Sequence, residues 1–141
     1  MIRKIRLVPL AARILARLLA VEIGLRITKL PSVCRLLRIR LDMSASRPAS
    51  MSEVEIPGRF VRAVNLTNWT TQRWPWGDTC LRRCLVLAVQ LRDLEPVVRI
   101  GVTRDARGAF LAHSWLEISG QSIDPMSADF VTLTRSLPTE G

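Results

Sequence analysis

The sequence is poor in residues that commonly carry chemistry. Its 141 residues include no tyrosine, one histidine and three cysteines. Cys34, Cys80 and Cys84 are an odd number, and two of them lie four positions apart, which does not fit a disulfide framework and suits a reducing compartment. No stretch near the start approaches the roughly 18 apolar residues that a membrane span needs. These absences argue against a disulfide-stapled secreted domain and a membrane-spanning protein.

Acidic residues are also scarce. The chain contains 12 of them and 21 lysines and arginines, which gives a net charge of +9. The excess lies in residues 1–47, whereas residues 48–141 contain equal numbers of acids and bases. The basic residues are spread among leucines without an aromatic platform, so we do not expect a nucleic-acid partner.

The first seven residues resemble the basic start of a signal peptide. Arg13 and Arg17 interrupt the apolar stretch that should follow, and no small-residue cleavage site comes after it. We therefore expect a cytoplasmic protein, with an arginine-rich organellar presequence as the weaker alternative.

Residues 1–41 are predicted to form a basic, helical segment. The pattern indicates one helix over residues 5–30, and a second that starts at Pro31 and continues through Leu41. Two interpretations stay open for the broad apolar surface of the first helix. It packs on the rest of the protein with its arginines in solvent, or it docks on an acidic partner, a peptide or, less favoured, a membrane.

Residues 42–58 are predicted to be a linker and residues 59–141 a second domain. Residues 60–76 resist assignment because their second half is polar. A periodic apolar run then predicts a helix from Cys80 to Leu94, with Asp78 or Thr79 as its N-cap.

The remainder predicts strands over residues 97–103, 110–118 and 121–124, with a short further strand at residues 130–134. Turns are expected at residues 105–108 and at Ser119-Gly120. A helix followed by a small antiparallel sheet is an α+β arrangement.

Cys80 falls in the first turn of its predicted helix. Unpaired backbone N–H groups and the helix dipole favour an anion there, which suits a nucleophilic thiolate. The alternative is that Cys80 is a small buried hydrophobic residue, as most cysteines are.

His113 lies in the middle of the predicted strand over residues 110–118. If Ser119-Gly120 is a two-residue loop, Asp124 lies opposite Trp115 and is the diagonal, same-face neighbour of His113. A carboxylate there would hold the imidazole in one tautomer. The alternative is a half-exposed histidine beside an ordinary turn aspartate.

A metal site made of Cys80, Cys84 and His113 is disfavoured because the cysteine spacing is uncommon and no fourth ligand is evident.

The order and spacing of these residues resemble the transglutaminase-like leader peptidases of lasso-peptide biosynthesis. The matching motifs are a Cys-Leu-x-Arg helix start (Cys80 to Arg83), a Gly-Val strand (Gly101 and Val102), a His-x-Trp-x-Glu strand (His113 to Glu117) and an acid eleven residues after the histidine (Asp124). The resemblance covers about residues 60–130, and Ser114 stands where alanine is usual.

The resemblance implies a transglutaminase-like, papain-like fold with Cys80 as nucleophile, His113 as general base and acid, and Asp124 as its orienting partner. It implies no cofactor and no metal. Trp74 or Trp76 would supply a second oxyanion contact or line the substrate site, and Arg83 would pair with an acid.

The resemblance also implies the partners. The substrate is a ribosomally made precursor peptide, the leader is held by a separate recognition protein, and a cyclase acts on the product. The short chain looks like the stand-alone peptidase form. Two rivals remain: a transglutaminase-like acyltransferase that uses the same triad, and a non-catalytic binding module.

Overall fold

The computed structural model describes residues 7–43, 54–77, 80–124 and 131–132. Its helices are α2 (Leu7–Ile27), α3 (Leu30–Leu36), α4 (Gly58–Gln72), α5 (Cys80–Gln90) and the 3₁₀ turn η1 (Arg92–Leu94). Its strands are β1 (Arg40–Leu41), β2 (Val97–Arg104), β3 (Phe110–Ile118), β4 (Gln121–Ser122) and β5 (Val131–Thr132). Within these residues no helix is both long and apolar enough to cross a bilayer.

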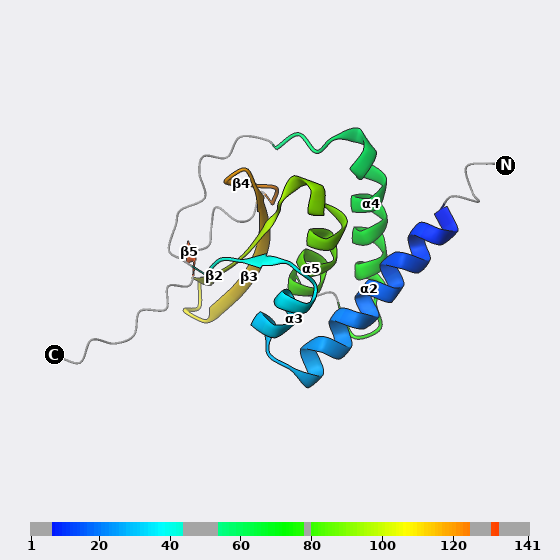
Figure 1. Cartoon of the computed structure of the whole chain (residues 1–141). Helices are drawn as coiled ribbons and strands as arrows, with labels where there is room; N and C mark the ends of the chain where they lie inside the picture. Colours follow the sequence, from blue (N-terminus) through cyan, green and yellow to red (C-terminus); the bar gives the residue numbers. More distant parts are fainter. Residues whose placement is uncertain (1–6, 44–53, 78–79, 125–130, 133–141) are drawn as a thin grey trace.

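The sheet has the order β1-β2-β3-β4, and β5 also pairs with β2. All pairings are antiparallel except that of β1 with β2, which is parallel. Helix α5 contacts β3 on one side and α2 and α4 on the other, so it is the central element of the fold (Figure 1). The predicted α+β arrangement is confirmed, with one parallel pairing that the sequence did not indicate.

The core forms around α5, in which five consecutive residues from Cys84 to Ala88 are buried. A helix that is buried on several sides in this way needs cover from more than the sheet. Ile14, Leu18 and Val21 of α2 supply it, and all three are fully buried. The N-terminal helix therefore packs in the same core as α5 and the sheet.

Helix α3 ends earlier than predicted, and the prediction of helix through Leu41 is wrong. Arg38 adopts a left-handed conformation with φ of 55°. The N–H of Ile39 then donates to the carbonyl of Cys34 at 2.8 Å, which closes the helix in a Schellman motif. The chain turns out of the helix, and Arg40 and Leu41 become β1 beside Val97 and Val98.

Helix α4 occupies the segment that the sequence left unassigned. Its buried side includes Thr67, Thr70 and Thr71 instead of aliphatic residues. The hydroxyl of Thr70 donates to the Leu66 carbonyl at 2.7 Å, and that of Thr71 donates to the Thr67 carbonyl at 2.9 Å. Because the helix itself satisfies these hydroxyls, they can be buried without an external partner.

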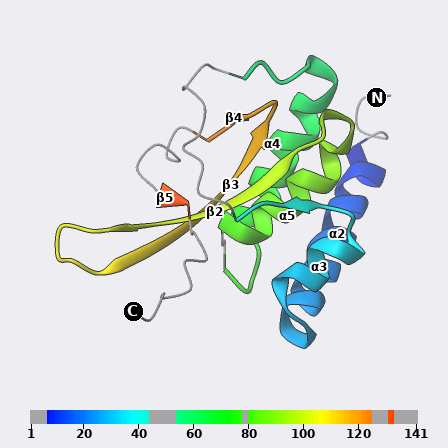
Figure 2. The same cartoon turned by 60° about the vertical axis from the view of Figure 1, so that its left-hand side comes forward.

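The predicted strands and turns of residues 97–122 are confirmed within two residues at their ends. The β2–β3 hairpin projects away from the helices (Figure 2). Its turn is closed by Asp105, whose carboxylate accepts from the N–H groups of Arg107 and Ala109. The predicted N-cap at Asp78 or Thr79 and most of the predicted linker, residues 44–53, lie outside the described residues.

Glu22, the single acid in the first 41 residues, is buried between α2 and α5. Arg82 of α5 donates to both of its oxygens, at 2.5 and 3.1 Å, and Arg26 donates at 2.8 Å. The hydrogen bonds from Arg82 and then Arg26 lower the pKa of Glu22 to about 2 against the burial that would raise it. This carboxylate therefore joins the N-terminal helix to the helix that begins with Cys80.

Acid is expected to weaken the fold through Glu22. Its pKa is lowered in the folded protein, so its contribution is complete above about pH 4.5 and is lost as the pH falls towards about 2. Urea unfolding as a function of pH should show the free energy of unfolding falling across this window. The Glu22→Gln variant, which cannot titrate, should fall less steeply; an identical slope in both proteins would contradict the assignment.

Candidate active site

Cys80 is the first residue of α5 and is partly exposed. The start of this helix is fixed from two directions. Arg82 binds Glu22 on α2, and one turn further on the Cys84 thiol donates to the Ser114 carbonyl of β3 at 3.2 Å. The Cys80 thiol is thus presented at a helix N-terminus that is anchored to both the helical layer and the sheet.

His113 and Asp124 are brought together by the β3–β4 hairpin. Glu117 pairs with Ser122 and Ile118 with Gln121, which leaves a two-residue loop. Both loop residues, Ser119 and Gly120, have positive φ (53° and 76°), as a type I′ turn requires. The register is the one that the sequence predicted.

In this register the Nε2 atom of His113 lies 2.6 Å from Oδ2 of Asp124. The histidine is 9% exposed, and the aspartate side chain is also largely covered. A short contact between imidazole and carboxylate fixes both the ring plane and the tautomer. With the proton on Nε2 towards Asp124, Nδ1 is the basic nitrogen of the neutral ring.

The start of α5 and Asp124 lie in one neighbourhood, because Arg83 and Cys84 of α5 line the same cavity as Asp124. Burial raises the pKa of Cys84 to about 12, although its hydrogen bond to Ser114 acts in the opposite direction. Cys84 itself is buried in the core, so of the two neighbouring cysteines Cys80 is the exposed one.

The His-x-Trp-x-Glu spacing places a buried polar network beside the histidine. The Trp115 ring stacks near the His113 ring, at 6.3 Å between centroids, and its indole N–H donates to Oε1 of Glu117 at 3.2 Å. Arg99 of β2 binds the other oxygen of Glu117 at 3.0 Å and also Asp42 at 3.1 Å. The Trp115 ring beside His113 is therefore positioned by this network of buried charges as well as by apolar packing.

Arg99 and Asp42 were not singled out from the sequence. The available signal was an arginine within the β-branched strand Val97–Arg104, where a charge is costly to bury without a partner. The partners themselves come from β3 and from the residue after β1, and no local pattern identifies them.

A cavity of about 340 Å³ opens beside the aspartate, between α4, α5 and the β3–β4 hairpin. Asp124 lies in its wall with Arg83 and Asn68, and the remaining lining is mostly apolar. The sequence motif thus brings Arg83 to the same cavity as the acid that holds His113.

The two candidate tryptophans have different surroundings. Trp74 and Trp76 contact each other edge to face, at 5.1 Å between centroids. The indole N–H of Trp74 is buried and contributes to the low pKa of Glu22, after Arg82 and Arg26, although it makes no hydrogen bond of ordinary geometry. Trp76 is half exposed, with the guanidinium of Arg26 at 5.7 Å from its ring centroid. Of the two, Trp76 is the one that a substrate can reach.

Among the residues that the structure describes, no three His, Cys, Asp or Glu side chains are grouped as ligands.

A family model of the transglutaminase-like superfamily matches residues 17–135. No curated protein and no solved structure matches the chain. The match covers most of the chain, including the second half of α2, so the protein belongs to the transglutaminase-like superfamily, whose members are generally cysteine-dependent enzymes. The α+β fold with a cysteine at the start of a central helix agrees with this membership.

The three cysteines are expected to differ sharply in reactivity. Cys34 and Cys84 are buried, and burial raises their pKa values to about 11 and about 12, so both stay protonated and covered at neutral pH. Iodoacetamide should therefore label Cys80 alone in the folded protein, as peptide mass spectrometry would show. Labelling of all three after denaturation is the control, and equal labelling in the folded state would contradict the arrangement.

Proposed function

We propose that this protein is a cysteine peptidase that removes the leader from a ribosomally made lasso-peptide precursor. The observation that carries the proposal is the contact of 2.6 Å between His113 and Asp124, in a chain whose accessible cysteine begins the central helix. Membership of the transglutaminase-like superfamily supports a cysteine-dependent reaction at an acyl group. The motifs of residues 80–83 and 113–117 support the leader-peptidase assignment within it.

In the proposed reaction the Cys80 thiol gives its proton to Nδ1 of His113, and the sulfur attacks the carbonyl carbon of the leader–core amide. The charged imidazole is stabilised by Asp124 through Nε2. Nδ1 then protonates the departing nitrogen, which leaves as the free α-amine of the core peptide. The leader remains bound to Cys80 as a thioester.

The second half reverses the proton transfers. His113 takes a proton from water, the resulting hydroxide equivalent attacks the thioester carbonyl, and Cys80 leaves with a proton returned by the imidazole. The products are a leader with a carboxylate end and the regenerated thiol. During both steps the backbone N–H of Cys80, at the start of α5, would donate to the oxyanion, and the indole N–H of Trp76 is our candidate for the second donor. Trp74 takes this role less readily because its N–H lies near Glu22.

The motifs of residues 80–83 and 113–117 resemble those of stand-alone leader peptidases. On this resemblance we propose that a separate protein binds the leader and delivers the precursor, and that a cyclase takes up the freed amine. We assign the substrate to the cavity whose lining includes Asp124 and Arg83, because it adjoins the His113–Asp124 pair.

A transglutaminase-like acyltransferase is the second candidate, because the superfamily match fits both. The thioester would be common to the two reactions, and only its acceptor differs, water in one and an amine in the other.

The test is mass spectrometry of the precursor peptide after incubation with this protein and its leader-binding partner. We expect one cut at the leader–core junction, with a gain of one water shared between the two fragments, and none with Cys80→Ala. The Cys34→Ala variant is the matched control and should cut normally. An acyltransferase would instead add the mass of the amine to the leader fragment, and cutting that survives Cys80→Ala would refute the triad.

A further inference from the structure

The outer side of α2 is an apolar surface that the fold does not cover. Leu15, Leu19 and Ile23 follow one another at intervals of four residues and are each about half exposed. Val8 before them is 69% exposed and Ile27 after them is 77% exposed. We call these five residues the α2 ridge. At about 1.5 Å per residue the α2 ridge is about 28 Å long. An ordinary protein surface exposes single, scattered aliphatic side chains and not a continuous row of this length.

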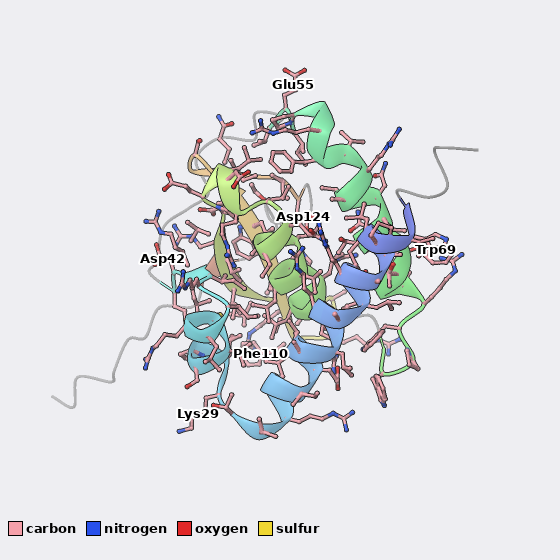
Figure 3. The ribbon with its side chains drawn as sticks, turned by 45° about the vertical axis from the view of Figure 1, so that its right-hand side comes forward. Lys29, Asp42, Glu55, Trp69, Phe110 and Asp124 are labelled. Atoms are coloured by element: carbon pink, nitrogen blue, oxygen red, sulfur yellow. The ribbon has the colours of Figure 1, made fainter. Side chains whose placement is uncertain are left out.

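The ridge lies on an open side of the molecule. The opposite side of α2 is the one that enters the core, through Ile14, Leu18 and Val21. Figure 3 shows α2 crossing the front of the protein, with Trp69 at the edge beside it. Trp69 of α4 and Trp76 are both about half exposed, and each has an arginine near its ring, Arg73 at 4.3 Å and Arg26 at 5.7 Å from the centroid.

The exposed charges of α2 and of the turn after it have one sign. They are Arg13, Arg26 and Lys29. The only acid in the first 41 residues is Glu22, which is buried and bound by Arg82 and Arg26. A partner that covers the ridge must therefore offer both apolar groups and negative charge.

We propose that the α2 ridge binds the surface of a membrane that contains anionic lipid, with α2 lying in the plane of the interface. An exposed aliphatic stripe with flanking arginines and neighbouring tryptophans is the combination that places a helix at the boundary of headgroups and acyl chains. The surface is the convex side of one helix, which a lipid layer accommodates without a shaped groove. A second copy of the chain is disfavoured, since the cations of the two copies would face each other.

The proposal is independent of the chemistry at Cys80, and flotation tests it directly. The full chain is mixed with vesicles of phosphatidylcholine alone or of an equimolar mixture with phosphatidylglycerol, and centrifuged through a density gradient. We expect the protein to float with the anionic vesicles only, and less of it at high salt, because salt screens the arginines.

The decisive variant replaces Leu15, Leu19 and Ile23 with glutamine. These side chains are outside the core and glutamine keeps helix propensity, so the fold should survive, which circular dichroism checks. The apparent affinity for anionic vesicles should fall at least about tenfold. A control with Phe110→Gln and Leu111→Gln, two exposed residues of the projecting hairpin, should float like the wild type.

Failure to float with anionic vesicles would overturn the proposal and would favour an acidic protein as the partner of the ridge. Equal flotation with neutral vesicles, or unchanged binding of the triple variant, would also overturn the proposal. None of these results depends on whether the protein cleaves a precursor.

Discussion

Exchanging Asp124 for asparagine is expected to lower the rate constant of precursor cleavage by about 10³–10⁴-fold while the protein stays folded. The Asp124 carboxylate only accepts hydrogen bonds, so Nε2 of His113 carries the proton, and Nδ1 is the basic nitrogen that we propose takes a proton from the thiol. An asparagine amide can donate to Nε2 instead, which stabilises the opposite tautomer with a proton already on Nδ1. That form cannot act as the base for Cys80.

The measurement is single-turnover cleavage followed by mass spectrometry, together with KM from initial rates. Because Asp124 is proposed to act through His113, kcat should fall and KM should stay nearly unchanged. Ser122→Ala is the matched control, since the Ser122 hydroxyl bonds to the backbone N–H and carbonyl of Asp124 and the substitution keeps the carboxylate. Retention of more than about a tenth of kcat in Asp124→Asn would remove the carboxylate from the mechanism.

The pairing of His113 with Asp124 could be predicted because it depends on local rules. A two-residue turn fixes the register of a hairpin, and the register fixes which side chains share a face. Ser119-Gly120 supplied the turn, and counting outward from it placed Asp124 diagonal to His113. A loop one residue longer would have put the carboxylate on the other face, so the prediction rested on the turn alone.

Helix α4 was missed for a physical reason that sequence periodicity does not detect. Hydropathy treats Thr67, Thr70 and Thr71 as solvent-facing, yet all three are buried, and the hydroxyls of Thr70 and Thr71 donate to carbonyls of their own helix. The end of α3 was missed because a left-handed arginine, Arg38, terminates it where glycine is usual.

The remaining surprises depend on contacts between distant segments. The two residues of β1 carry no strand signal of their own and are held by pairing with β2. Glu22 could be recognised as the single acid of a basic helix, but its partner Arg82 lies 60 positions away. Such contacts decide how Cys80, His113 and the ridge of α2 are arranged, and only the folded chain reveals them.

Replacing Glu117 with glutamine is expected to cost about 3 kcal/mol of unfolding free energy. Glu117 and Arg99 are both buried and bound to each other, and removing one charge leaves the other without full compensation. The expected cost is at the lower end of the range for buried pairs because Asp42 still binds Arg99. Glutamine keeps an acceptor for the Trp115 indole N–H, so the loss reports the charge and not that hydrogen bond. Urea unfolding followed by circular dichroism measures it.

The double variant Arg99→Met and Glu117→Gln separates charge from packing. It buries no charge and keeps most of the side-chain volume, so it should recover about 1–2 kcal/mol relative to Glu117→Gln alone. A double variant less stable than either single one would mean that shape, and not paired charge, supports the Trp115 ring. Since Trp115 stacks near the ring of His113, the single variant should also cleave more slowly at temperatures where it is still folded. The loss of cleavage rate should be smaller in the double variant, because Arg99 no longer leaves an uncompensated buried charge beside Trp115 and His113.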